Sequence, residues 1–171
     1  MTPPPDVVRP GVVRPGVVRL TEADAGEVLT IQRAAYGPEA QNYGDPELPP
    51  LRETLDEVRA SLRSPDVIGL GLREDGRLLG SVRLRVADGV AHLGRLAVVP
   101  DRQGEGIGTV LLRACEAALP AGVREIRLFT GSRSDPTIRL YERLGYVRGG
   151  ETDMVTHMVV HLTKHVTPAA H

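Results

Sequence analysis

The segment Leu96–Thr109 constrains the fold more than any other part of the chain. An apolar run is followed by Gly104, Gly106 and Gly108, and an amphipathic stretch with apolar residues at helical spacing begins at Ile107. Glycine lets the backbone approach a ligand closely, and the free N–H groups and dipole at a helix start favour an anion. The segment therefore predicts a strand–turn–helix unit that binds a phosphate group.

Two familiar phosphate-binding loops do not fit this segment. A Walker-type loop needs a lysine after its last glycine, whereas Gly108 is followed by Thr109 and Val110. A dinucleotide-binding loop needs Gly-x-Gly-x-x-Gly, and Thr109 stands where the last glycine would fall. A tight turn without a ligand is the remaining alternative, but three alternating glycines exceed what a turn needs.

Length and charge narrow the class of protein. The chain has 171 residues, of which 41% are hydrophobic and 25% charged, as in an ordinary globular domain. Its net charge of −1 gives no reason to expect nucleic-acid binding or attachment to a membrane surface. Cys115 is the only cysteine, which excludes an internal disulfide and a multi-cysteine zinc site. No apolar run reaches the ~20 residues of a membrane span and no secretion signal is present, so we expect a cytoplasmic protein.

Hydrophobic periodicity and turn signals predict a mixed α/β sheet with helices on its faces. The expected strands are 17–20, 67–72, 78–86, 90–99, 124–130 and 153–166, and the expected helices are 21–35, 51–62, 107–119 and 136–144. Residues 36–50 are expected to form a long irregular connection. A Val-Val-Arg repeat precedes the domain, and Pro-Gly breaks follow its first two copies. We therefore predict a flexible tail over 1–16, a domain over 17–166 and a short tail over 167–171.

Two motifs resemble one known family. Gln103–Gly108 matches the Gln/Arg-x-x-Gly-x-Gly/Ala signature of GCN5-related N-acetyltransferases (GNAT), and Arg95–Pro100 looks like the fourth strand of that family. Ile138–Tyr146 is similar to its last helix, which shows a Leu-Tyr-x-x-x-Gly-Phe/Tyr pattern. The resemblance implies an acyl-CoA acyltransferase fold. Its central sheet is mostly antiparallel, is splayed between strands 4 and 5, and carries helices on both faces.

The resemblance also implies an activity, namely transfer of an acetyl group from acetyl-CoA to a primary amine by direct attack in a ternary complex. Tyr141 would protonate the departing coenzyme A sulfur as general acid, and the Val98 N–H would polarise the thioester carbonyl. The implied pantetheine contacts are Leu96, Ala97 and Val98, and the implied pyrophosphate contacts are Gln103, Gly104, Glu105, Gly106, Ile107, Gly108 and Thr109. Taken alone, Tyr141 is better interpreted as a packed aromatic residue on an amphipathic helix, and the family resemblance reverses that preference.

The chain departs from the family pattern at two places. Relatives often have asparagine at the start of the last helix, where Ser134 and Thr137 would contact pantetheine here. Many relatives also carry a glutamate base on the fourth strand, where the nearest match is His92. A solvent-facing or packed strand histidine is an equal alternative, and Glu22 is a weaker candidate for the base.

The acceptor is not identified by the sequence. The family places its acceptor site at the loop between the first two helices, and this loop holds Tyr36, Tyr43, Asp45 and Glu47. These residues suit a cationic amine, although a solvated loop would look the same. Small metabolites, antibiotics, polyamines and protein amines all stay open. Dimerisation is common in the family, but the sequence shows no interface.

Two alternatives keep the fold and change the function. One is a non-catalytic acyl-CoA sensor. The other is an acyltransferase with a different acyl-CoA, such as succinyl-CoA, which an arginine near the acyl end could favour; Arg95 and Arg139 do not decide this, because the chain is rich in arginine. A metal site is not expected. His157, His161 and His165 lie in a predicted strand, where residues four apart are ~13 Å apart, too far for one ion.

Overall fold

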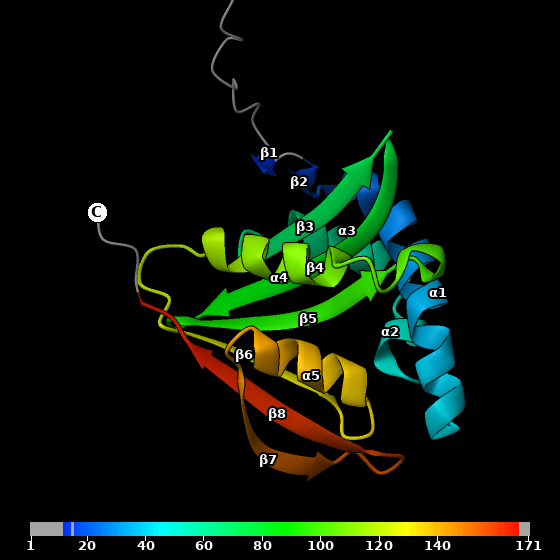
Figure 1. The fold of residues 1–171 in the computed structure, drawn as a ribbon. Coiled ribbons are helices and arrows are strands. Elements are labelled where there is room, and N and C mark those ends of the chain that lie inside the picture. The colour runs from blue at the N-terminus through cyan, green and yellow to red at the C-terminus, as the bar shows by residue number, and fades with distance from the viewer. Residues whose placement is uncertain (1–11, 15, 168–171) are drawn as a thin grey trace, which may run out of the picture.

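The computed structural model describes residues 12–14 and 16–167. Their strands form one eight-stranded sheet (Figure 1). The strand order is β1-β2-β3-β4-β5-β6-β8-β7, and the β5/β6 pair is parallel whereas the other pairs are antiparallel. The strands are β1 (Val12–Arg14), β2 (Val17–Arg19), β3 (Val67–Glu74), β4 (Arg77–Ala87), β5 (Val90–Val98), β6 (Glu125–Gly131), β7 (Val147–Asp153) and β8 (Met158–His165). The α-helices are α1 (Ala25–Tyr43), α2 (Pro49–Arg52), α3 (Leu55–Arg63), α4 (Ile107–Ala117) and α5 (Asp135–Arg143), with 3-10 turns η1 (Glu22–Asp24) and η2 (Pro100–Arg102).

Helices cover both faces of the sheet, as predicted. Helices α4 and α5 lie on one face, and α3 lies on the other (Figure 1). Side-chain positions agree: a Cβ at Gly80 of β4 would meet Leu111 of α4, whereas a Cβ at Gly69 of β3 would meet Leu62 of α3. The predicted mixed and mostly antiparallel sheet is therefore confirmed. Within the described residues, no helix combines the length and the apolar character that a membrane span requires.

The sheet opens between β5 and β6. These strands pair only over Val90–His92 and Glu125–Arg127, whereas β6 stays paired with β8 along its full length to Gly131. The second half of β5 therefore pairs with β4 on one side and, among the described residues, with no strand on its β6 side. The predicted separation of the fourth and fifth strands of the domain is confirmed, and it creates an open strand edge inside the sheet.

Helix α1 is longer than predicted. The sequence suggested a loop from Tyr36 because Pro38 breaks most helices, but α1 continues through Pro38 to Tyr43. Proline has a φ angle that fits a helix, so its main cost here is one lost backbone hydrogen bond. The helix ends at Gly44, whose φ of 61° is left-handed. The predicted loop is therefore wrong in its first half, and α1 gains two further turns.

Three smaller differences concern element boundaries. The predicted helix 51–62 is two helices, because Thr54 caps α3 by accepting a hydrogen bond from the Glu57 N–H at 3.2 Å. The predicted last strand, 153–166, corresponds to β8, whereas β7 (Val147–Asp153), which pairs with β8 as a hairpin, was not predicted. Val12–Arg14 pairs with β2 instead of belonging to a tail. Residues 1–11 and 168–171, which make up most of the two predicted tails, lie outside the described part of the chain.

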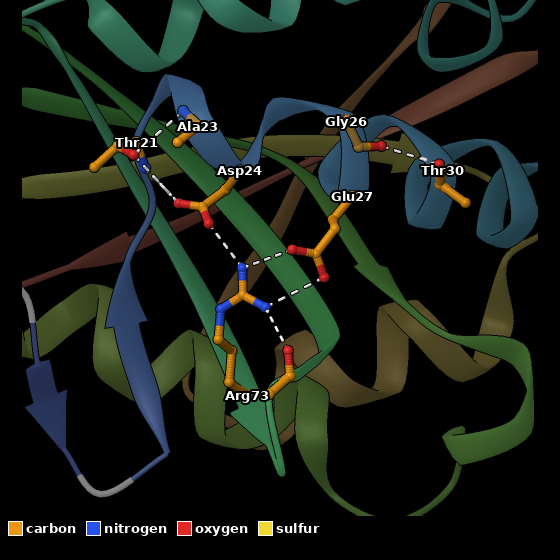
Figure 2. A network of polar contacts seen from close by, with 8 residues as sticks. Thr21, Ala23, Asp24, Gly26, Glu27, Thr30 and Arg73 are labelled. Carbon is orange, nitrogen blue, oxygen red and sulfur yellow. Dashed lines mark hydrogen bonds and ion pairs between the residues drawn. The ribbon is translucent and has the colours of Figure 1, made fainter.

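An ion-pair network attaches the start of α1 to the end of β3 (Figure 2). Arg73 donates to Asp24 at 2.7 Å, to Glu27 at 2.9 Å and to the carbonyl of Gly76 at 2.9 Å. Asp24 also accepts a hydrogen bond from the Thr21 N–H at 2.8 Å, which closes a capping box. One guanidinium therefore bonds two carboxylates and a carbonyl, and it fixes where α1 begins on the sheet.

Candidate active site

A cavity of about 1470 Å³ lies where β5 and β6 separate. Its walls come from α1, α2, β4, the second half of β5, the glycine turn and α5. All but one of the residues predicted from the sequence line it, namely His92, Leu96, Ala97, Val98, Gln103, Gly104, Gly106, Ile107, Gly108, Thr109, Ser134, Thr137 and Tyr141. The fold therefore brings together motifs that lie on three different elements.

The exception is Glu105, whose side chain does not line the cavity. Its carboxylate pairs with Arg102 Nε at 2.8 Å, and Arg102 also binds Glu74 at 2.5 Å. The predicted contact of Glu105 used its backbone amide and not its carboxylate. The salt bridges fix the outer side of the glycine turn against the β3/β4 hairpin.

The glycine turn has the backbone geometry that an anion site needs. Gly104 and Gly106 have φ angles of 80° and 84°, and a Cβ at either position would meet no atom within 4 Å. Glycine is therefore required here by the left-handed backbone and not by a lack of space. Gly106 is the N-cap of α4, so the first N–H groups of this eleven-residue helix face the cavity side of the turn. These donors fit a pyrophosphate.

Strand β5 carries a bulge at its centre. Its register with β4 shifts between Ser81 and Arg83, and Arg95 has a φ of 58°. Past the bulge, the Val99 N–H donates to the Leu79 carbonyl of β4 at 2.9 Å. Because successive N–H groups of a strand point to opposite edges, the Val98 N–H points away from β4, toward the open edge. Gln103 ties the glycine turn to this strand by donating to the Val98 carbonyl at 3.2 Å.

Tyr141 lies on α5 and is 4% exposed. Its ring packs edge-to-face on Tyr146 with the ring centroids 5.4 Å apart. Burial raises the pKa of Tyr141 well above its usual value of 10, and the nearby Tyr36 raises it further. The phenol therefore keeps its proton at neutral pH. Helix α5 ends as predicted at Gly145, which has a φ of 95°, but its N-cap is Ser134 and not Asp135.

The C-terminal half of α1 presents one face to the cavity. Tyr36, Glu39 and Tyr43 follow at helical spacing, and all three line the cavity. The Tyr36 hydroxyl donates to the Leu96 carbonyl of β5 at 3.0 Å. The Tyr43 hydroxyl accepts a hydrogen bond from the Arg133 N–H at 3.1 Å. This face of α1 thus bridges the open edge of β5 and the loop before α5.

Glu39 is the carboxylate that the sequence analysis missed. It accepts a hydrogen bond from the Ser134 hydroxyl at 3.2 Å. Burial raises the pKa of Glu39 above its usual 4.5, and it outweighs the Ser134 hydrogen bond and the charge of His157, which lower it. The signal in the sequence was the helical spacing of Tyr36, Glu39 and Tyr43. It places Glu39 on the same face as the two tyrosines if the helix is continued through Pro38.

Tyr43 is held tightly at the end of β6. Its ring stacks on His157 with the centroids 4.6 Å apart, and the Arg133 guanidinium lies 4.6 Å from the ring centroid. A Cβ at Gly131 would lie 2.0 Å from the Tyr43 hydroxyl, so only glycine fits at the end of this strand. Ser134, predicted to contact pantetheine, lies within 3.4 Å of the Tyr43 hydroxyl as well as bonding Glu39.

Other residues predicted for the reaction or the acceptor lie elsewhere. His92 lies on the cavity wall with an exposed side chain. Glu22 does not line the cavity and pairs with Arg63 at 3.5 Å. The two acidic residues predicted for the acceptor also fall outside, because Asp45 accepts from Thr156 at 2.8 Å and Glu47 pairs with Arg52. The acidic residues that line the cavity are instead Glu39, Glu53 and Glu57.

Two arginines and Glu53 form a second polar cluster in the wall. Arg83 of β4 donates to the Glu53 carboxylate at 2.5 and 3.1 Å, and Arg95 Nε lies 3.5 Å from it. Gln32 of α1 donates to Glu53 at 2.9 Å and accepts from Arg83 at 3.1 Å. Burial raises the pKa of Glu53, but the hydrogen bonds from Arg83 and Gln32 outweigh it, so the net shift is downward. Glu53 is therefore ionised at neutral pH.

The C-terminal histidines serve local contacts. His161 hydrogen-bonds the Thr152 hydroxyl at 2.7 Å, and His165 lies 4.0 Å from Glu125. Among the described residues, histidine, cysteine, aspartate and glutamate nowhere form a group of three that could hold a metal ion.

Comparisons with known proteins agree with this geometry. Residues 27–146 match the sequence model of the Acetyltransferase (GNAT) family. The chain is 32% identical to S-(2-succino)cysteine N-acetyltransferase of Bacillus subtilis strain 168, over 84% of this chain and 91% of that protein. It is 36% identical to mycothiol acetyltransferase of Thermomonospora curvata over 56% of this chain, but it spans only 34% of that longer protein.

Solved structures show the same fold at low identity. The ribosomal-protein-S18-alanine N-acetyltransferase of Escherichia coli superposes with a TM-score of 0.72 at 19% identity, over 90% of this chain and 95% of that one. The PaiA N-acetyltransferase of Thermoplasma acidophilum, solved in complex with coenzyme A, gives 0.68 at 20% identity, over 88% of this chain and 98% of that one.

Proposed function

Since the chain belongs to the GNAT family and is an acetyl-CoA-dependent N-acetyltransferase, we propose that it acetylates the primary amine of a small amino-acid-type acceptor. One observation carries this proposal: the cavity gathers the β5 edge, the glycine turn, Tyr141 and the polar face of α1 in one space. The acceptor class follows the Bacillus subtilis relative, which is named for S-(2-succino)cysteine and aligns along nearly its whole length. An S-substituted cysteine is therefore the first acceptor to test.

Acetyl-CoA supplies the activated acetyl group as a thioester. The backbone N–H groups of Gly104–Thr109 and the start of α4 would hold its pyrophosphate. The open edge of β5 at Leu96–Val98 would hydrogen-bond the pantetheine as an added strand does. Ser134 and Thr137 line the same cavity and offer hydroxyl groups to the pantetheine amides.

Three groups of the chain would act on the reacting atoms. The amine adds to the thioester carbonyl, forming the C–N bond, and the Val98 N–H stabilises the negative charge that develops on the oxygen. The C–S bond then breaks, and Tyr141 gives its proton to the thiolate. Glu39 accepts the proton that the amine loses, directly or through water.

The acid role of Tyr141 is tested with Tyr141→Phe. We expect kcat for coenzyme A release to fall roughly 100-fold, the usual contribution of a positioned acid, while the KM for acetyl-CoA stays within about threefold. Tyr146→Phe is the matched control, because Tyr146 is 5% exposed, packs on Tyr141 and does not line the cavity. Equal activity of Tyr141→Phe and wild type would remove Tyr141 from the mechanism.

The base is tested through the pH dependence of kcat/KM. Burial raises the pKa of Glu39 above its usual 4.5. As the pH is lowered, its carboxylate therefore becomes protonated, and activity is lost, at a higher pH than for an exposed glutamate. We expect Glu39→Gln to lower kcat/KM roughly 100-fold at neutral pH and to remove this acid limb. His92→Gln is the comparison: if it removes the limb and Glu39→Gln does not, the base is His92.

A further inference from the structure

The cluster of Arg83, Glu53 and Arg95 carries an unbalanced charge. Two guanidinium groups share one carboxylate, which leaves a net charge of +1 in the cavity wall. Arg83 is 7% exposed and Arg95 is half-buried, and the Nε atoms of both are buried without a hydrogen-bond partner. A buried donor without a partner is costly. The Nε atoms are closed to solvent, but the Arg95 side chain is 31% exposed and lines the cavity, so its guanidinium is the part of the cluster that a group from outside the chain can reach.

The backbone at Arg95 is strained in a way that fits a binding role. Its φ of 58° lies in the left-handed region, which a residue with a long side chain rarely adopts. Asp75, Asp88 and Val155 share this conformation, but all three lie in the connections between strands, whereas Arg95 lies inside β5. The bulge places the Arg95 side chain in the cavity beside Leu96. Strain of this kind persists where a site requires the side chain.

The cluster also lies beside the predicted reaction centre. Tyr36 donates to the Leu96 carbonyl on the open edge of β5, and both guanidinium charges act on the Tyr36 hydroxyl, where they oppose the rise in its pKa caused by burial. The two arginines are therefore next to the strand edge along which the thioester would lie. A ligand that they hold would be close to the amine that attacks it.

We infer that Arg95, supported by the charge of Arg83, forms a carboxylate-binding site that selects acceptors bearing a carboxylate near the reactive amine. A guanidinium presents parallel N–H donors that match a carboxylate, and the surplus of one positive charge matches one carboxylate. Glu53 and Gln32 hold Arg83 in place from the opposite side. The inference rests on the proposed function, since it gives the acceptor of that same reaction its recognition group.

The test compares acceptors and variants in one steady-state assay with acetyl-CoA. The acceptors are S-(2-succino)cysteine, S-(2-succino)cysteamine without the α-carboxylate, S-methylcysteine without the succinyl carboxylates, and S-butylcysteamine without any carboxylate. Arg95→Gln should raise the KM for S-(2-succino)cysteine about 10- to 100-fold, as expected when a charge-assisted hydrogen bond is lost. The KM for S-butylcysteamine and for acetyl-CoA should stay within about threefold. The intermediate acceptors identify which carboxylate Arg95 binds.

Two further variants separate binding from folding. Arg95→Gly removes the guanidinium and relieves the left-handed backbone, so it should fold at least as well as wild type and still show the raised acceptor KM. Arg139→Gln is the matched control, because Arg139 is exposed on α5 and does not line the cavity. It should behave as wild type with every acceptor.

The arginines could instead bind a carboxylate on the acyl donor, such as the free carboxylate of a succinyl group. The assay is therefore repeated with succinyl-CoA in place of acetyl-CoA. If Arg95→Gln raises the KM for succinyl-CoA and leaves the acceptor KM unchanged, the arginines bind the acyl chain and the inference is overturned. It is also overturned if wild type uses S-butylcysteamine as well as S-(2-succino)cysteine. Equal use of S-butylcysteamine would still demonstrate acetyl transfer to an amine. If wild type acetylates none of the four acceptors, the proposed acceptor class itself is wrong.

Discussion

The molecule contains two arginine clusters that look alike in sequence and differ in chemistry. At the end of β3, Arg73 binds Asp24 and Glu27, so two carboxylates surround one guanidinium (Figure 2). In the cavity wall, Arg83 and Arg95 share the single carboxylate of Glu53. The first cluster carries a net charge of −1 and the second a net charge of +1.

The two clusters differ in whether their arginine N–H donors are already bonded within the protein. Arg73 donates hydrogen bonds to two carboxylates and a backbone carbonyl, and these bonds attach α1 to the sheet. The cavity arginines keep buried Nε atoms without partners, and one of them lies on a strained backbone. A saturated arginine is a structural tie, whereas an unsaturated one in a cavity wall is available to a ligand. Exposure alone would have suggested the reverse, because Arg83 is the more buried of Arg73 and Arg83.

The largest stability effect is expected in the cavity cluster. Arg83→Met removes both hydrogen bonds that Glu53 accepts from Arg83. It leaves this carboxylate, which is 13% exposed, with Gln32 at 2.9 Å and the Arg95 Nε at 3.5 Å. We expect the free energy of unfolding to fall by about 3 kcal/mol, because breaking a buried ion pair leaves a poorly compensated charge. Urea denaturation followed by circular dichroism measures this change.

A double variant checks the cause of that loss. Replacing both partners, as in Arg83→Met with Glu53→Met, removes the most buried ion pair and leaves only the Arg95 guanidinium, whose side chain is 31% exposed and reaches solvent. Most of the lost stability should return, since apolar residues of similar volume replace buried ion pairs at little cost. If the double variant is less stable than Arg83→Met, the pair itself contributes the energy, and the contrast between the two clusters weakens.

A smaller effect is expected at the Arg73 cluster. Arg73→Met removes ion pairs whose partners reach solvent, since the side chain of Glu27 is 50% exposed and that of Asp24 is 20% exposed. The free energy of unfolding should fall by about 1 kcal/mol, because solvent screens these charges and hydrates the carboxylates left behind. The same urea denaturation measures it.

Activity separates the two clusters most sharply. Arg73→Met should leave kcat and the acceptor KM at wild-type values, because no atom of this network lines the cavity. A change in acceptor KM in this variant would show that the start of α1 controls its cavity face, and the division into a structural and a binding cluster would fail.

Much of the site could be predicted from local sequence. The alternating glycines at 104, 106 and 108 predicted the turn before α4, because their backbone conformation is a local property. Tyr141 and Gly145 followed from the pattern of the last helix. The sequence-derived site residues number fourteen, and all of them except Glu105 line the cavity.

The missed residues depended on contacts between distant elements. Glu39 was hidden by Pro38, since proline ends most helices and only the packing of α1 against β5 shows that this one continues. Arg83 alternates with apolar residues along β4, which ordinarily indicates a solvent-facing position. Instead α1 and Glu53 cover that face, so Arg83 is buried.

The sequence by itself therefore determined most of the elements, the glycine turn before α4 and the helix that carries Tyr141, because each rests on residues within one helix or turn. Only the tertiary structure decided which charges face the cavity. Asp45 accepts a hydrogen bond from Thr156 and Glu47 pairs with Arg52, both outside the cavity. Arg83 and Arg95 instead pair with Glu53 in the cavity wall. Charge at a site is a sum over chain segments that are distant in sequence, and it becomes fixed only when they pack together.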